Sequence, residues 1–183
     1  MLQLILLTAL LQVTPVETPA TSASTATEIE WLTLAEAEAL SKKENKPLLI
    51  DFYTDWCGGC KKLDASTYKD PEVIALVNKY FYPVKFDAES KEAYTFNGEQ
   101  FAFRPSGSRG TNEFALKYAA RNGRLGYPTT TFMYANGETL AIVPGYQDAD
   151  NMELLLRFLG EGHFENMDFA TFKSQESGAN LGD

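Results

Sequence analysis

The feature that most restricts the fold of this chain is a short apolar run that leads directly into its only two cysteines. Residues 48–53 read Leu-Leu-Ile-Asp-Phe-Tyr. A run that is apolar except for Asp51 is typical of a central strand covered on both faces. Trp56-Cys57-Gly58-Gly59-Cys60-Lys61 follows, where a helix is expected to begin. Two thiols three positions apart at such a junction can close into a disulfide and reopen with little backbone movement. The sequence therefore predicts a redox-active pair.

Cys57 is the candidate nucleophile because it stands at the start of the predicted helix, where we expect its thiol to be exposed and acidic. Unpaired backbone N–H groups and the positive end of the helix dipole favour a thiolate there. The dipole contributes roughly 1 kcal/mol, which is less than one pKa unit, whereas lowering a thiol pKa from about 8.5 to about 7 needs about 2 kcal/mol. Other donors must contribute, and Gly59, unlike a proline, keeps its N–H for this purpose.

Two stretches resemble the signatures of a known family. Residues 50–61, from Ile50 through both cysteines to Lys61, resemble the active-site stretch of the thioredoxin superfamily, and Tyr127-Pro128-Thr129 resembles its second signature. The resemblance extends from about residue 29 to about residue 160 and is strongest to the secreted, thioredoxin-like reductase branch. It implies an α/β fold with a central mixed β-sheet flanked by helices.

The resemblance also implies a role for Asp51 as the proton acceptor for Cys60, the resolving cysteine. A carboxylate inside an apolar strand is costly, and burial raises the pKa of an aspartate, so Asp51 is expected to exchange a proton near neutral pH. The competing interpretation is structural: an aspartate at the end of a strand that accepts hydrogen bonds from loop amides.

Three further residues are expected to contact the substrate, namely Trp56, Tyr127 and Pro128. The resemblance implies that the Tyr127–Pro128 peptide bond is cis and faces the two cysteines. Only about 5% of X-Pro bonds in folded proteins are cis, so this expectation comes from the motif and not from the proline itself. The Tyr127 backbone would then be free to pair with an extended substrate segment.

Charge and composition exclude several other classes of protein. The formal net charge of −9 and the pI of about 4.7 argue against binding to nucleic acid or to anionic membranes. His163 is the only histidine and is expected at the surface, which argues against a Ser-His or Cys-His hydrolase. A second Cys-x-x-Cys is absent, so a closed zinc site is not expected, and the chemistry needs no metal or organic cofactor.

The first 27 residues have the shape of a signal peptide followed by a flexible leader. Residues 1–13 are apolar but too short to span a bilayer comfortably, and a segment rich in Pro, Thr, Ser and Ala follows. No Lys or Arg precedes the apolar stretch, which departs from the usual pattern. We expect export to the periplasm or outside the cell, with no stable membrane insertion of the mature chain.

The remaining chain is expected to form one thioredoxin-like domain over residues 28–160 and a partly ordered tail over residues 161–183. Hydrophobic periodicity and turn signals predict the elements in order, and two helix starts are marked locally, one by a capping box of Thr33 with Glu36 and one by Asp70 before Pro71. Strands are expected at 29–32, 48–53, 82–87, 129–134 and 139–143, and helices at 34–44, 58–66, 71–81, 113–121 and 148–159.

An insertion of about residues 90–111 precedes the strand that begins after Pro128. Within it, an Asn97-Gly98 pair lies between alternating aromatic residues, which predicts a β-hairpin with Tyr94, Phe96, Phe101 and Phe103 on one face. One interpretation is that this face packs on the domain and extends its core. The other is that part of it borders Cys57 and binds substrate or a partner, with residues 104–110 as a mobile rim.

Two functions fit these observations. The first is a thiol-disulfide oxidoreductase that reduces or exchanges disulfides of proteins or small molecules through Cys57 and Cys60. In an exported setting, such a protein would be re-reduced by a membrane-bound electron donor. The alternative is a non-catalytic binding module in which Cys57 and Cys60 form a permanent structural disulfide.

Overall fold

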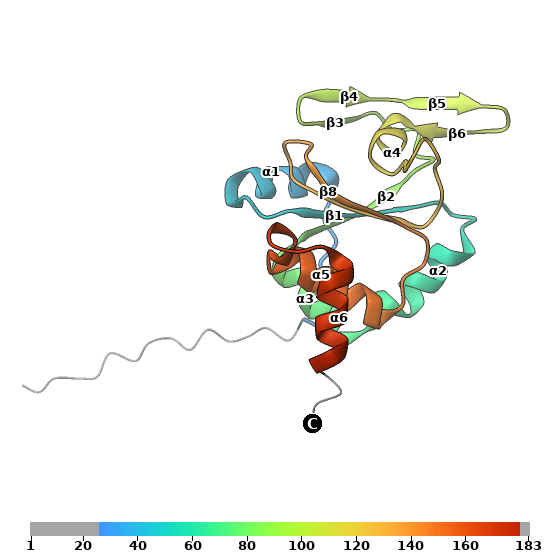
Figure 1. Ribbon diagram of the computed structural model, residues 1–183. Helices are drawn as coiled ribbons and strands as arrows, with labels where there is room; N and C mark the ends of the chain where they lie inside the picture. Colours follow the sequence, from blue (N-terminus) through green and yellow to red (C-terminus); the bar gives the residue numbers. More distant parts are fainter. Residues whose placement is uncertain (1–25, 180–183) are drawn as a thin grey trace, which may run out of the picture.

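A four-stranded mixed sheet forms the centre of the computed structural model, which describes residues 26–179 (Figure 1). Its strand order is β2-β1-β7-β8. The bounds are Leu48–Tyr53 for β1, Tyr82–Asp87 for β2, Thr129–Met133 for β7 and Thr139–Pro144 for β8. β1 runs parallel to β2, whereas β7 is antiparallel to both β1 and β8. The predicted mixed sheet with a buried central strand is confirmed.

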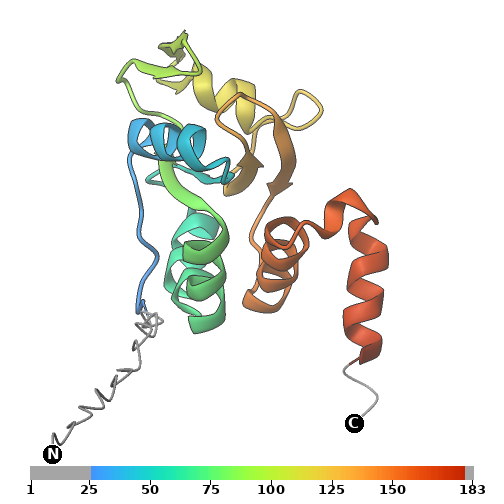
Figure 2. The same cartoon turned by 90° about the vertical axis from the view of Figure 1, so that its left-hand side faces the viewer.

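Helices cover both faces of this sheet. They are α1 (Leu34–Glu44), α2 (Gly58–Ala65), α3 (Pro71–Tyr80), α4 (Glu113–Tyr118), α5 (Ala149–Gly160) and α6 (Phe169–Ala179), with 3-10 turns at Thr67–Lys69 and His163–Glu165. α1 and α4 lie on one face, and α2, α3, α5 and α6 lie on the other (Figures 1 and 2). Among the described residues, no helix has the length and apolarity needed to cross a membrane.

The alternation of side chains along β1 divides the core into two clusters and decides where Asp51 lies. Leu48, Ile50 and Phe52 pack with α1 and α4, whereas Leu49 packs with α2, α3 and α5. Because successive side chains of a strand point to opposite faces, Asp51 shares the face of Leu49. The carboxyl group is therefore directed to the side of the sheet on which α2 lies.

The structure differs from the sequence-based expectation at both ends of the domain. Residues 29–32 form no strand: Leu32 makes a single isolated bridge to Val84, because the preceding backbone bonds locally from Trp31 to Ile29. Beyond residue 160, where we expected a partly ordered tail, the chain forms α6. This helix is held against α5 by the buried Phe172, whose ring lies 5.5 Å from that of Phe158.

Two hairpins, not one, make up the insertion. β3 (Tyr94–Phe96) pairs with β4 (Glu99–Phe101), and β5 (Phe103–Ser106) pairs with β6 (Arg109–Asn112). The predicted turn is confirmed: Tyr94 pairs with Phe101 across a two-residue loop in which Asn97 and Gly98 have φ values of 49° and 76°. Positive φ at both positions favours this Asn-Gly sequence. The predicted mobile rim at residues 104–110 is instead the second hairpin.

The first hairpin extends the hydrophobic core, as one of the two interpretations required. Phe96 and Phe101 are buried against Phe114 of α4, with ring centroids 5.3 Å from it in each case, and Tyr94 packs on Phe86. The expectation that Phe103 belongs to this face is wrong. It begins β5, and its ring lies over Gly110 on the paired strand, where a Cβ atom would come within 2.3 Å of it.

The packing of Phe96 gives a first test. Replacing this fully buried ring by Phe96→Ala should lower the free energy of unfolding by about 3–5 kcal/mol, because it removes buried apolar surface and leaves a cavity. Leu116→Ala on the exposed side of α4 is the control and should change the value by less than about 0.5 kcal/mol. Urea denaturation measures both. Equal small effects would show that the hairpin does not contribute to the core.

Candidate active site

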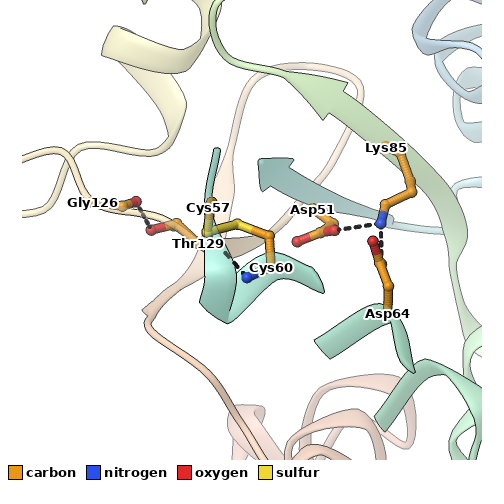
Figure 3. Close-up of a disulfide and its surroundings, with 7 residues drawn as sticks. All are labelled: Asp51, Cys57, Cys60, Asp64, Lys85, Gly126 and Thr129. Atoms are coloured by element: carbon orange, nitrogen blue, oxygen red, sulfur yellow. Dashed lines mark hydrogen bonds and ion pairs between the residues drawn. A yellow bond between two sulfur atoms is a disulfide. The ribbon is translucent and has the colours of Figure 1, made fainter. Parts of the chain in front are cut away.

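Cys57 and Cys60 form a disulfide at the N-terminus of α2 (Figure 3). Cys57 is the N-cap of the helix, and its Sγ accepts a hydrogen bond of 3.0 Å from the Cys60 N–H. That position is usually taken by a serine, threonine or aspartate oxygen, which satisfies one of the unpaired donors of the first turn. The same donor is available to a Cys57 thiolate when the disulfide is open, so the sulfur has a local source of stabilisation beyond the helix dipole.

Both cysteines are nearly buried in the disulfide form. Cys57 is 4% exposed and Cys60 is 2% exposed, so our expectation of an exposed Cys57 is wrong for this state. The loop before β7 lies against the same turn, where a Cβ atom on Gly59 would be 3.0 Å from Pro128 Cδ. Gly59 therefore has a role that the sequence did not reveal: it leaves room for the Pro128 ring.

The Tyr127–Pro128 peptide bond is cis, as the resemblance implied. The Pro128 carbonyl accepts a hydrogen bond of 2.8 Å from the Gly145 N–H, and the Thr129 hydroxyl donates one of 2.8 Å to the Gly126 carbonyl. In the part of the chain that the structure describes, the backbone N–H and C=O of Tyr127 have no hydrogen-bond partner. These two groups can therefore pair with an added extended segment.

Asp51 lies between Cys60 and a lysine that the sequence analysis missed. Figure 3 shows its side chain directed into the space between Cys60 and Lys85. Lys85 stands opposite Asp51 in the parallel register of β1 and β2, and its Nζ is 3.2 Å from Asp51 Oδ2. The same Nζ makes a second, closer ion pair with Asp64 of α2. Lys85 is therefore shared between a buried carboxylate and a partly exposed one.

The environment of Asp51 is unfavourable to a negative charge. The residue is fully buried, and apart from the Lys85 ion pair its carboxylate oxygens have no hydrogen-bond partner within residues 26–179. Burial raises the pKa of Asp51 to about 6, even though the charge of Lys85 acts in the opposite direction. Near neutral pH the group is therefore able to accept and release a proton. The alternative, in which the Asp51 carboxylate accepts hydrogen bonds from loop amides, does not fit, because no such hydrogen bond exists among the described residues.

The aromatic side chains expected at the substrate surface do lie together. Trp56 is 52% exposed, and its ring meets that of Tyr127 edge to face, with 6.2 Å between centroids. Burial raises the pKa of Tyr127 to about 12, a rise that the nearby Thr111 of β6 counters in part. The guanidinium of Arg109, also on β6, lies 4.6 Å from the centre of the Trp56 ring. The second hairpin of the insertion thus borders the site.

Sequence reasoning missed Lys85, Asp64 and Arg109. A lysine within the apolar pattern of residues 82–87 was a visible signal, since a charge there needs a partner. Its partner depends on strand register, which the sequence did not supply. Asp64 and Arg109 gave no comparable signal, because each stands in a polar stretch.

The model of the thioredoxin-like domain family matches residues 34–160, and the chain belongs to this family. Curated relatives match shorter stretches. The chain is 40% identical over 47 residues to the thiol:disulfide interchange protein DsbD of Vibrio vulnificus. The matched stretch is 26% of this chain and 8% of that protein. The chain is also 36% identical over 70 residues to DsbD of Neisseria meningitidis. That stretch is 38% of this chain and 12% of that protein. The chain thus corresponds to a small part of these relatives.

Solved structures agree on the fold. A putative disulphide-isomerase from Bacteroides thetaiotaomicron is 28% identical, with a TM-score of 0.51 over 73% of this chain and 93% of that chain. A thioredoxin-fold protein from Helicobacter pylori is 18% identical, with a TM-score of 0.54 over 74% of this chain and 86% of that chain. The central sheet and its helices are therefore those of a thioredoxin fold.

The raised pKa of Asp51 predicts a pH-dependent gain in stability on Asp51→Asn. The pKa of Asp51 is about 6 in the folded chain and about 4 in the unfolded chain. Folding therefore becomes less favourable as the pH rises from 4 to 6, and the full cost of the buried charge is present above pH 6. The variant should be more stable than the wild type by about 2–3 kcal/mol at pH 8, and the difference should close as the pH falls from 6 to 4.

Denaturation of both proteins at a series of pH values measures this difference. Asp150→Asn, at an exposed position of α5, is the control, and its stability difference from the wild type should show no comparable change with pH. An Asp51→Asn variant that is less stable than the wild type at pH 8 would contradict the assignment of Asp51 as an unfavourably buried acid.

Proposed function

We propose that this chain is a thiol-disulfide oxidoreductase that reduces or exchanges disulfides through Cys57 and Cys60. One observation carries the proposal: the disulfide at the start of α2 lies beside a buried carboxyl group, Asp51, whose pKa is about 6. Perturbed acids that adjoin a reactive group are typical of catalytic sites. The names of the relatives, a thiol:disulfide interchange protein and a putative disulphide-isomerase, support the same chemistry.

The reaction begins with the open, reduced pair. The Cys57 thiolate, which the Cys60 N–H faces, attacks one sulfur of the substrate disulfide. The substrate S–S bond breaks, a mixed disulfide forms on Cys57, and the first substrate thiolate leaves. Asp51 then takes the proton of the Cys60 thiol, and the Cys60 thiolate attacks the Cys57 sulfur. The second substrate thiolate leaves, and two electrons have passed from the pair to the substrate.

Trp56, Tyr127 and Pro128 would position the substrate. The free N–H and C=O of Tyr127 support pairing with an extended segment that carries the substrate cysteine. Trp56 offers an exposed aromatic face beside it. The substrate is therefore a protein or small disulfide whose backbone can lie along this loop.

The oxidised pair must be reduced again before the next turnover. We propose that the chain acts after export and that a membrane-bound electron donor supplies the two electrons. The signal-peptide pattern that motivates export lies almost entirely in residues 1–25, outside the described part of the chain.

A permanently closed Cys57–Cys60 bond is the second candidate, and the near-complete burial of both cysteines favours it. Equilibration with mixtures of reduced and oxidised glutathione distinguishes the two, with the fraction of free thiols as the measurement. A redox-active pair opens and closes reversibly, whereas a structural disulfide stays closed at every physiological ratio.

The proposed roles of the two cysteines predict unequal trapping. In Cys60→Ser the resolving thiol is missing, so the mixed disulfide on Cys57 should accumulate when the reduced variant meets a protein disulfide. In Cys57→Ser the remaining Cys60 is buried inside the first turn, so the amount of mixed disulfide that it forms should be at least tenfold lower. Non-reducing gel electrophoresis after acid quenching measures both adducts. Equal trapping by the two variants would show that the roles are wrongly assigned.

A further inference from the structure

The five arginines of the chain fall into two groups. Arg104 and Arg157 pair with carboxylates: Arg104 Nε is 2.6 Å from Glu113, and Arg157 Nη1 is 2.5 Å from Glu176. Arg109, Arg121 and Arg124 have no carboxylate within 4 Å among residues 26–179, although the chain as a whole is strongly acidic. All three of these arginines lie around the loop that contains Tyr127 and Pro128.

Arg109 is held at the mouth of the site by an aromatic contact. Its guanidinium lies over the Trp56 ring, 4.6 Å from the centroid, and both side chains are exposed. A guanidinium held against a ring keeps N–H groups that do not face the ring, and these are able to bind an oxyanion. The Trp56 ring also meets Tyr127, so this cation lies close to the free backbone that a substrate segment would pair with.

Arg121 and Arg124 line a cavity at the start of the same loop. They form a tight turn in which each N–H donates to the other carbonyl, at 2.9 and 3.0 Å. The cavity beside this turn has a volume of about 550 Å³ and is also lined by Gly126 and Pro144. Gly126 directly precedes Tyr127, and Pro144 pairs with Thr129 across the sheet, so the cavity continues from the proposed substrate loop.

Carboxylates nearby restrict how a charged segment can approach. Asp55, Asp87 and Glu89 lie close enough to one another that their repulsion contributes, after burial, to raising the pKa of Asp87. Asp87 and Glu89 also act on the Tyr127 hydroxyl, so an acidic segment along Tyr127 is attracted to the arginines and repelled by these carboxylates, which restricts where its own carboxylates can lie. Electrostatic complementarity of this kind sets partner choice and association rate more than total affinity.

We propose that Arg109, Arg121 and Arg124 select substrates in which an acidic, extended segment flanks the reactive disulfide. This inference rests on the proposed function and names its substrate class: proteins with Asp or Glu next to the cysteine that Cys57 attacks. The segment lies along Tyr127, with its carboxylates on Arg109 and in the cavity of Arg121 and Arg124.

Two matched peptide disulfides test the proposal, one with two glutamates beside each cysteine and one with glutamines in their place. Stopped-flow fluorescence gives the second-order rate constant with which each peptide oxidises the chemically reduced protein. The acidic peptide should react faster with the wild type, and added salt should remove the difference. Arg109→Gln should lower the acidic-to-neutral rate ratio about threefold, and Arg109→Gln combined with R121Q and R124Q about tenfold.

Arg104→Gln is the matched control, because it lies on the same hairpin but faces Glu113, and it should leave the ratio unchanged. A second measurement is independent of redox activity: serine analogues of both peptides are titrated into the oxidised protein, and the NMR shift of the Trp56 indole N–H is followed. Preferential binding of the acidic analogue, lost in the triple variant, supports the proposal even if the protein reduces neither peptide. Equal responses to the two analogues, or a ratio unaffected by the triple substitution, would overturn it.

Discussion

The ion pair between Asp51 and Lys85 is the contact around which the site is built. It exists because β1 and β2 run parallel in a register that places these two residues opposite each other, on the face covered by α2. A carboxylate at the centre of a sheet would otherwise have no compensation for its lost hydration. The charge of Lys85 offsets part of this lost hydration. Because Lys85 also pairs with Asp64, it stabilises the Asp51 carboxylate less than it would in an exclusive pair. A carboxyl group in this state can change protonation near neutral pH.

Much of the fold could be predicted from the sequence because local signals agreed with one another. The run of residues 48–53, the capping box of Thr33 with Glu36, the Asp70-Pro71 helix start and the Asn97-Gly98 turn each have a local physical cause, and each is present in the structure. The first strand was one exception. Its apolar residues suggested pairing, but strand formation depends on a neighbour that only Leu32 reaches.

The site was predictable only where a motif marked it. Cys57, Cys60 and Asp51 stood out as two thiols and a lone carboxyl in an apolar setting, whereas Lys85 and Arg109 acquire their partners from β-sheet register and hairpin position. The exposure of Cys57 was misjudged for a similar reason. The loop that lies against its turn is about 70 residues away in sequence, and its approach depends on a glycine without a side chain at position 59.

The insertion has a root and a tip with different freedom to change. Its root is fixed: Phe96 and Phe101 are buried, and Asn97 donates from its backbone to Glu38 of α1 and from its side chain to the Asn136 carbonyl, at 2.8 and 2.7 Å. Its tip, residues 104–109, is exposed throughout and contributes nothing to either core cluster. Sequence changes in the tip therefore leave the domain intact while altering what stands beside Trp56. The surface beside Trp56 can therefore diverge in sequence while the thioredoxin-like domain and its Cys57–Cys60 disulfide stay the same.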